Sequence, residues 1–405
     1  MAASVLLLEV GIVFTALAVV GALGSRLGQS VIPFYILVGM VLSPYVLGRV
    51  ALPIDGSLFI QETAFIEVAA ELGIVLLLFY LGLEFNINRL LEHRRKIGIV
   101  GTIDLLVNFT VGWVLGYALF GALLPAFLTA GIVYISSSAI ITKSLIDRGW
   151  IVNDEAQPIL GTLVYEDLFI AVYLAVISAV VLGGDGLREA ALGVGVALGI
   201  ILVLFLVAYF GTPLFERLLR TSSHEFTVLR ALGVTVLIAG VALTLGVSEA
   251  VAAFFAGMAF SSTTYVTDLE ELLEPLRDTF AAIFFFWIGL ITDPLLFVEV
   301  LGVIALLVVV SGPPKLLSGF LSGRVYDLDA RRSTRVGIAL GTRGEFSLII
   351  AAVALAGAGT SLLPEVSQTI YAFTVGYVLV MSVLGSTFMR YSSPLESFAV
   401  ARFGP

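Results

Sequence analysis

Long uninterrupted apolar runs restrict the fold of this chain more than any other feature of its sequence. The stretch 191–210 contains twenty residues without a single charge, and about 20 apolar residues suffice for a helix to cross a bilayer. Only 13% of the 405 residues are charged, against about 25% in an average soluble domain. So little charge cannot cover the surface of a soluble protein of this size. The sequence therefore excludes a cytosolic enzyme and predicts an all-α polytopic membrane protein.

The apolar runs divide into thirteen candidate transmembrane helices, separated by charged or Pro- and Gly-rich breaks. The division near Gly246 and Val247 is the least marked of these breaks. The expected spans are 4–23, 31–50, 66–86, 97–120, 123–146, 157–183, 189–211, 229–246, 248–264, 275–292, 296–322, 334–357 and 367–390. An odd number of spans places the two termini on opposite sides of the membrane.

The basic residues predict the orientation. If the N-terminus lies outside, seventeen of the 21 Lys and Arg residues fall on the cytoplasmic side, and only Arg49 and Arg188 fall on the other. The remaining two, Lys315 and Arg343, lie inside spans. Because Lys and Arg are enriched in cytoplasmic loops, we expect an outside N-terminus and a cytoplasmic C-terminus, in a prokaryotic cell membrane.

Three pairs of segments indicate an internal repeat. The pairs are PFYILVGMVLSP (33–44) with AFFAGMAFSS (253–262), FYLGLEFN (79–86) with FWIGLITD (286–293), and the polar breaks at 136–138 and 341–345. Five spans thus occur twice, seven spans apart, and an odd offset inverts the second copy. Inverted repeats with interrupted helices at matching positions are typical of secondary transporters with a site at mid-membrane. We therefore expect two inverted five-helix repeats with crossed discontinuous helices.

Adjacent acids in the sixth span are the leading candidates for that site. Glu166 and Asp167 lie about ten residues into the span, near mid-depth at a rise of about 1.5 Å per residue. Two neighbouring carboxylates in a low dielectric cannot easily both ionise, which raises their proton affinity. Such a pair can hold either protons or a cation such as Na⁺ or K⁺. A structural acid bonded to a neighbouring helix is the alternative reading of each residue.

Polar breaks and buried cations complete the candidate site. Hydroxyls of Ser136, Ser137 and Ser138, with unwound backbone carbonyls, offer further oxygen ligands. Lys315 follows two prolines, which free carbonyls for a nearby cation, and it is expected either to pair with Glu166 or to neutralise half-helix ends.

Other charges within the spans are expected to compensate one another. Arg343 is predicted to pair with Glu345 in the same break or with Glu84 at the end of the third span, because a permanently charged Arg cannot carry protons. Asp104, which stands four residues before Asn108 in the fourth span, is a weaker candidate of the same structural kind.

Several of these segments resemble motifs of the monovalent cation:proton antiporters of the Kef and NapA type. RLGQ at 26–29 followed by YILVG at 35–39 resembles the family's RLGQ…GYLLAG, and FYLGLE at 79–84 resembles FLIGLEL. Residues 136–149 are similar to SSTAVVLKLLEERG, and residues 269–289 are similar to EDIEPFRGLLLGLFFVSVG. Residues 341–350 are similar to SQGGEFAFVL. The resemblance covers all thirteen spans in order.

This resemblance implies the antiporter fold in a single transmembrane module, 1–405, that forms homodimers. A scaffold and dimer domain would comprise mainly 1–92 and 189–292, and a mobile core mainly 97–183 and 296–390. Asp167 matches the essential ion-binding aspartate of the family, and Lys315 matches the membrane lysine of NapA-type members.

The adjacent acids and one expected domain depart from the family. The pair here is Glu-Asp, whereas Kef-type members typically have Gln-Asp and electrogenic sodium exchangers Asp-Asp. This places the site closer to the sodium exchangers and favours electrogenic exchange. The nucleotide-binding regulatory domain usual in Kef-type systems is absent from the sequence, so it is expected either to be a separate partner or to have been truncated.

Together these features predict a non-enzymatic antiporter that exchanges Na⁺ or K⁺ for protons by alternating access, without a bound cofactor. A bile-acid-type sodium symporter and a glutathione-gated type of potassium efflux module remain alternatives. An intramembrane aspartyl protease would need two catalytic aspartates in a Gly-x-Gly-Asp-like setting, which is not found. A channel would conduct ions without coupling them to protons.

Overall fold

In the computed structural model the described residues form helices joined by turns and loops, with one isolated β-bridge between Ala358 and Leu362. The described residues are 2–49, 59–84, 87–182, 195–196, 198–200, 202–204, 206–207, 210–221, 223–245 and 248–404. The helices are α1 (Ala2–Leu27), α2 (Ile32–Leu42), α3 (Ala64–Glu84), α4 (Ile87–Phe120), α5 (Leu123–Tyr134), α6 (Ser138–Asp147), α7 (Ala156–Leu182), α9 (Thr212–Leu219), α10 (His224–Thr244), α11 (Glu249–Ser261), α12 (Val266–Leu290), α13 (Leu295–Val325), α14 (Ala330–Leu340), α15 (Glu345–Ala356), α16 (Pro364–Arg390) and α17 (Ser393–Phe403), with 3₁₀ turns at η1 (Leu47–Arg49) and η2 (Trp150–Val152).

Ten segments of the described chain are long and apolar enough to cross a membrane, and they coincide with ten of the thirteen predicted spans. The predicted span 189–211 lies largely outside the described residues, and the break at Gly246 and Val247 lies wholly outside them. The predicted span 248–264 is α11, which has only 13 residues. The span 275–292 is the second half of α12, whose first half is rich in acidic residues. The membrane fold is confirmed, while the count of thirteen is not.

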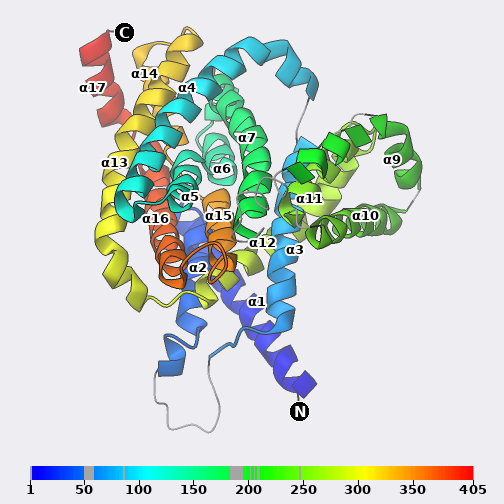
Figure 1. The fold of residues 1–405 in the computed structure, drawn as a ribbon. Coiled ribbons are helices and arrows are strands. Elements are labelled where there is room, and N and C mark those ends of the chain that lie inside the picture. Colours follow the sequence, from blue (N-terminus) through cyan, green and yellow to red (C-terminus); the bar gives the residue numbers. More distant parts are fainter. Residues whose placement is uncertain are drawn as a thin grey trace. The chain divides into compact units, whose positions relative to one another are not determined.

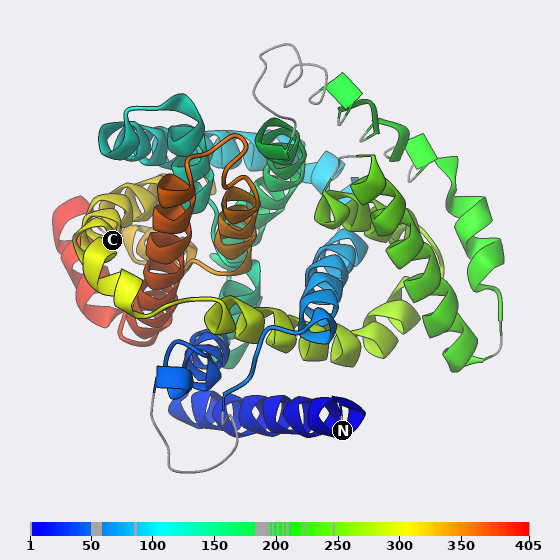
Figure 2. The same ribbon diagram turned by 60° about the horizontal axis from the view of Figure 1, so that its bottom comes forward.

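The chain divides into two compact units. The first comprises 1–21, 35–88 and 171–292, and the second comprises 22–34, 89–170 and 293–405. In the first unit α3 packs along α11 and α12. In the second, α13 lies against α14 and α16 (Figure 1), and α15 lies against α16 (Figure 2).

Glycines allow the helices of the first unit to touch through their backbones. A side chain at Gly39 would collide with the carbonyl oxygen of Phe286, and one at Gly289 would collide with that of Ile36. Between α3 and α11 the same pairing recurs, because Gly82 lies against the carbonyl of Phe254 and Gly257 against that of Phe79. The repeat explains the match: it relates Gly39 to Gly257 and Gly82 to Gly289, so each helix contact is converted into the other.

The second unit follows the same rule. Added Cβ atoms at Gly112 and Gly116 of α4 would lie 2.8 Å from the Cα atoms of Ala130 and Ala126. At Gly319 and Gly323 of α13 they would lie 2.5 and 2.6 Å from the Cα atoms of Gly337 and Ser333. Gly319 and Gly323 stand 207 positions after Gly112 and Gly116, and their contact partners Gly337 and Ser333 stand 207 positions after Ala130 and Ala126. Gly289 follows Gly82 by the same number. This separation of 207 is shared by both contacts of the second unit and by Gly82 and Gly289, which supports the predicted internal repeat, whereas Gly39 and Gly257 are 218 positions apart.

Candidate functional site

Two interrupted helices meet in the second unit. Helix α5 ends at Tyr134 and α6 begins at Ser138, while α14 ends at Leu340 and α15 begins at Glu345. The backbone between the halves is unwound, and the amide of Ser137 donates to the carbonyl of Thr342 at 3.2 Å. Both predicted breaks are therefore present and in contact, which leaves half-helix ends inside the protein.

Cations lie at the carboxyl ends of these half-helices. Arg343, fully buried, donates from Nε to the carbonyl of Val133 and from Nη1 to those of Leu340 and Thr342, each at 3.0 Å. Lys315 donates to the carbonyl of Tyr134 at 2.9 Å. The last carbonyls of a helix lack partners within the helix and carry its negative partial charge. The two side chains therefore satisfy and neutralise these ends.

Glu345 lies at the opposite kind of helix end. Its carboxylate accepts from Ser137 Oγ at 2.8 Å, from Ser138 Oγ at 3.3 Å and from the Ala139 amide at 3.5 Å, at the start of α6. No ion pair joins Arg343 to Glu345 among the described residues, contrary to the expectation. Arg343 instead binds backbone carbonyls at helix ends, and Glu345 binds mainly the Ser137 and Ser138 hydroxyls at the start of α6. Glu84 ends α3 in the first unit, and its pairing stays a prediction.

A buried charge cluster lies beside the crossing. Lys315 Nζ is 2.8 Å from Glu166 Oε1 and 2.6 Å from Asp104 Oδ2, and all three side chains have no exposed surface. The ion pair expected between Lys315 and Glu166 is thus present, and Asp104 shares the same ammonium. Pro313 and Pro314 precede Lys315 without ending α13, which runs on to Val325.

Glu166 connects this cluster to the first break. One carboxylate oxygen accepts the Ser136 amide at 2.6 Å, and the other accepts Ser136 Oγ at 2.9 Å. The Ser136 hydroxyl also lies 3.0 Å from the carbonyl of Leu340 in the second break. Hydrogen bonds from an unwound backbone amide favour the ionised carboxylate. Glu166 is therefore held by Ser136 of the first break and by Lys315.

Asp167, the next residue of α7, is 7% exposed. The three predicted serines are divided between two acids, since Ser136 contacts Glu166 whereas Ser137 and Ser138 contact Glu345. Among the described residues, no three His, Cys, Asp or Glu side chains are grouped as a resident metal site would require.

Asp104 carries more weight in the structure than the sequence indicated. Its Oδ1 accepts from Asn108 Nδ2 at 2.9 Å and from Ser318 Oγ at 2.6 Å. The only available sequence signal was the i, i+4 spacing of Asp104 and Asn108 in an apolar span, which places both on one helix face. That spacing does not reveal which helix the face meets.

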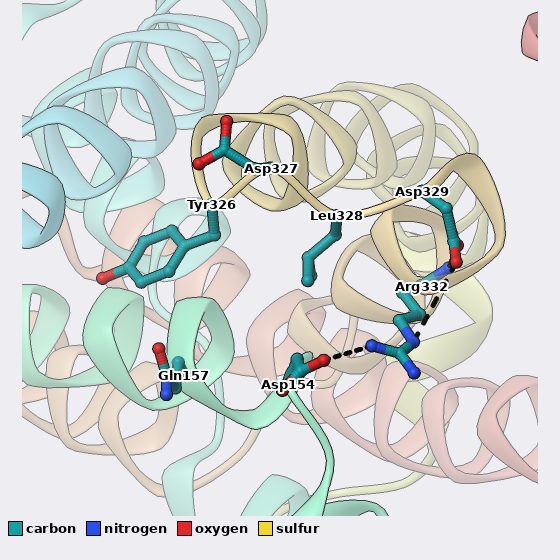
Figure 3. Close-up of a pocket in the computed structure, with 7 residues that line it drawn as sticks. All are labelled: Asp154, Gln157, Tyr326, Asp327, Leu328, Asp329 and Arg332. Atoms are coloured by element: carbon teal, nitrogen blue, oxygen red, sulfur yellow. Dashed lines mark hydrogen bonds and ion pairs between the residues drawn. The ribbon is translucent and has the colours of Figure 1, made fainter.

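An open pocket of about 380 Å³ lies elsewhere in the second unit (Figure 3). It contains none of the predicted site residues and is lined by Asp154, Gln157, Tyr326, Asp327, Leu328, Asp329 and Arg332. Arg332 forms ion pairs with Asp154 and Asp329 across it, and burial raises the pKa of Tyr326. The charged side chains that line the pocket form ion pairs. None of them belongs to the buried cluster of Lys315, Glu166 and Asp104, so the two features are distinct.

A second ion-pair network attaches α17 to α14. Arg335 donates to Glu396 at 2.9 Å and to Glu155 at 2.8 Å, and Ser392 Oγ donates to Glu396 at 2.7 Å. Burial raises the pKa of Glu396, but the hydrogen bonds from Arg335 and Ser392 and the charges of Arg335 and Arg331 outweigh it. The pKa of Glu396 therefore lies below its ordinary value.

Comparison with known proteins places these features in a wider group. The family described as "Sodium/hydrogen exchanger, transmembrane" matches residues 12–391. The K(+)/H(+) antiporter subunit KhtU of Bacillus subtilis is 34% identical over 94% of this chain and 92% of its own length. The ammonium/H(+) antiporter subunit AmhT of Alkalihalophilus pseudofirmus is 27% identical over 96% of this chain and 94% of its own. The solved structure of the sodium proton antiporter MjNhaP1 from Methanocaldococcus jannaschii has a TM-score of 0.75 at 15% identity, covering 98% of this chain and all of the other.

Proposed function

Because the chain belongs to the transmembrane sodium/hydrogen exchanger family, we propose that it exchanges a monovalent cation, K⁺ or Na⁺, for protons by alternating access. The observation that carries this proposal is the buried Lys315–Glu166 ion pair at the contact of two interrupted helices. Buried charge at mid-membrane is costly and marks ion or proton pathways. A cation or a proton that takes the Glu166 carboxylate has to displace Lys315 from it.

In the proposed cycle, Glu166 and Asp167 bind the transported ions in turn. Protons neutralise the carboxylates when the site faces the more acidic side. Loss of protons on the other side admits a dehydrated cation, whose remaining ligands come from the Ser136 hydroxyl and backbone carbonyls of the two breaks. The empty site carries excess negative charge, and the cost of moving bare charge through the bilayer holds it in place. Ligand binding of either kind lowers that cost.

We further propose that the core of this cycle comprises mainly 97–183 and 296–390 and that mainly 1–92 and 189–292 form a scaffold through which the protein dimerises. The N-terminus is placed outside and the C-terminus in the cytoplasm, on the distribution of Lys and Arg. KhtU is named as an antiporter subunit, which supports a separate regulatory partner for this chain. The two acids supply two proton sites, which supports electrogenic exchange.

The test is proton movement in proteoliposomes that carry an imposed pH gradient. K⁺ or Na⁺ is added outside, with the membrane potential clamped in one series and free in another. We expect one of these cations to dissipate the gradient and the rate to depend on potential. Asp167→Asn should abolish the exchange, whereas the matched control Asp268→Asn, an exposed residue of α12, should retain it.

Two outcomes would contradict the proposal. One is a wild-type protein with which no monovalent cation moves protons. In that case Na⁺-dependent uptake of organic anions is measured, because a sodium symporter is the alternative function. The other is an Asp167→Asn protein that exchanges cations at the wild-type rate, which would remove the acids from the mechanism.

A further inference from the structure

The proposed cycle uses Glu166, Asp167 and Lys315 but leaves one member of the buried cluster without a role. Asp104 is fully buried and 2.6 Å from Lys315, closer than Glu166 at 2.8 Å. A second carboxylate on one ammonium is not needed to satisfy the lysine's charge. A buried carboxylate is also costly to keep without a purpose.

The hydrogen bonds of Lys315 are fully assigned. An ammonium group has three N–H donors, and the described helices face it with three acceptors: Asp104 from α4, the Tyr134 carbonyl from α5 and Glu166 from α7. When a cation occupies Glu166, one of these partners is lost. Asp104 and the Tyr134 carbonyl remain, so the ammonium keeps a counter-charge and two acceptors without leaving its position.

The two carboxylates are held by different parts of the fold. Glu166 is bonded to Ser136 in the unwound break, where cation ligands are available. Asp104 is bonded to Asn108 of its own helix and to Ser318, one turn beyond Lys315 on α13. Its partners are therefore intact helices. This asymmetry makes Glu166 the exchangeable partner of Lys315 and Asp104 the permanent one.

We propose that Asp104 is a positioning residue that retains Lys315 when a cation takes the Glu166 carboxylate, and thereby sets the affinity for the cation. This inference rests on the proposed exchange function. Without the charge of Asp104, freeing Glu166 would leave a buried ammonium with no carboxylate partner. Lys315 would then compete with the cation for Glu166 throughout the cycle.

The experiment is a double-mutant cycle in proteoliposomes, read as the KM for the cation and the maximal rate. Asp104→Asn should raise KM about tenfold or more, the size expected for losing a charge-assisted hydrogen bond, with the maximal rate within about threefold of wild type. Asp104→Glu should restore KM in part. In a Lys315→Gln background the Asp104→Asn effect on KM should disappear, because the competitor is gone.

A second pair of variants guards against misfolding. Ser318→Ala removes one hydrogen bond to Asp104 and should raise KM about two- to threefold. Ser322→Ala, equally buried on α13 but bonded to the carbonyl of Ser318, should leave KM unchanged. Cation protection in thermal unfolding of the purified proteins gives the affinity without transport.

The outcomes separate this inference from the function on which it rests. If wild-type protein shows no cation-dependent proton movement, the exchange function itself fails. If wild type exchanges cations and both Asp104→Asn and Ser318→Ala keep its KM, Asp104 is structural and the inference is wrong. An Asp104→Asn effect of equal size in the Lys315→Gln background would also overturn it.

Discussion

The backbone contact between α3 and α11 predicts a specific cost for adding one methyl group. In Gly257→Ala the new Cβ would lie 2.9 Å from Gly82 Cα and from the Leu83 amide, and closer still to the Phe79 carbonyl oxygen. Ordinary contacts of this kind begin at about 3.4 Å. The helices must therefore separate by at least several tenths of an ångström, and they cannot do so locally because the reciprocal contact at Gly82 is just as tight.

Overpacking of this kind costs about 1–3 kcal/mol. Alanine also gains about 0.5–1 kcal/mol over glycine inside a helix, so the matched control is a glycine with open surroundings. Gly240 in α10, with no atom within 4 Å of an added Cβ, isolates this gain. The difference in free energy of unfolding between Gly257→Ala and Gly240→Ala should equal the cost of the collision, about 1–3 kcal/mol.

Thermal unfolding of the purified variants in one detergent measures this difference. At about 2 °C per kcal/mol for a large chain, Gly257→Ala should unfold about 2–6 °C below Gly240→Ala. The double variant Gly82→Ala with Gly257→Ala should cost less than the two single changes together, because one separation of the helices relieves both collisions. Equal melting temperatures for Gly257→Ala and Gly240→Ala, or fully additive losses, would refute this account of the contact.

Two further predictions concern buried and interfacial charge. Lys315→Met leaves Asp104 and Glu166 buried without their shared cation, and should lower the free energy of unfolding by about 3–5 kcal/mol; thermal unfolding beside the exposed control Lys143→Met checks this, and equal losses for the two variants would contradict it. The pKa of Glu396 is lower in the folded protein than its ordinary value, so its stabilising effect is present above about pH 4.3 and is lost as the pH falls through the folded pKa. The melting temperature of Glu396→Gln should therefore lie below that of wild type at pH 7 and approach it as the pH falls below about 4.3, and a constant difference would be inconsistent with this ion pair.

Local patterns allowed much of the fold to be predicted. Apolar runs located ten spans because burial in lipid needs an unbroken apolar helix. The Gly-Met and Gly-Leu segments indicated the repeat because close helix contacts require glycine at those positions, and the structure has Gly39, Gly82, Gly257 and Gly289 at backbone contacts. The breaks at 136–138 and 341–345 were visible as polar residues inside apolar helices.

Partner choice within the site was harder to predict. The sequence suggested that Arg343 pairs with Glu345 because opposite charges stand two residues apart. In the folded chain Arg343 is bonded to backbone carbonyls at helix ends, and Glu345 is bonded to the hydroxyls of Ser137 and Ser138. No local pattern reveals these pairings, because Val133 is 210 positions from Arg343 and Ser137 is 208 positions from Glu345. Asp104 was ranked low for a related reason, since its partner Lys315 is 211 positions away and only the packing of α4 on α13 brings the two together.

The exchanged glycine contacts bear on the ancestry of the fold. Contacts that convert into one another under the repeat are those that two identical half-length chains would make if they dimerised in opposite orientations. A half-length ancestor of this kind would have had to insert into the membrane both ways round, with nearly equal numbers of basic residues on its two faces. Joining two copies removes that requirement, because each half then keeps one orientation. Lys315 and Asn108 stand 207 positions apart and therefore correspond under the repeat, so the two copies now differ in charge at this position.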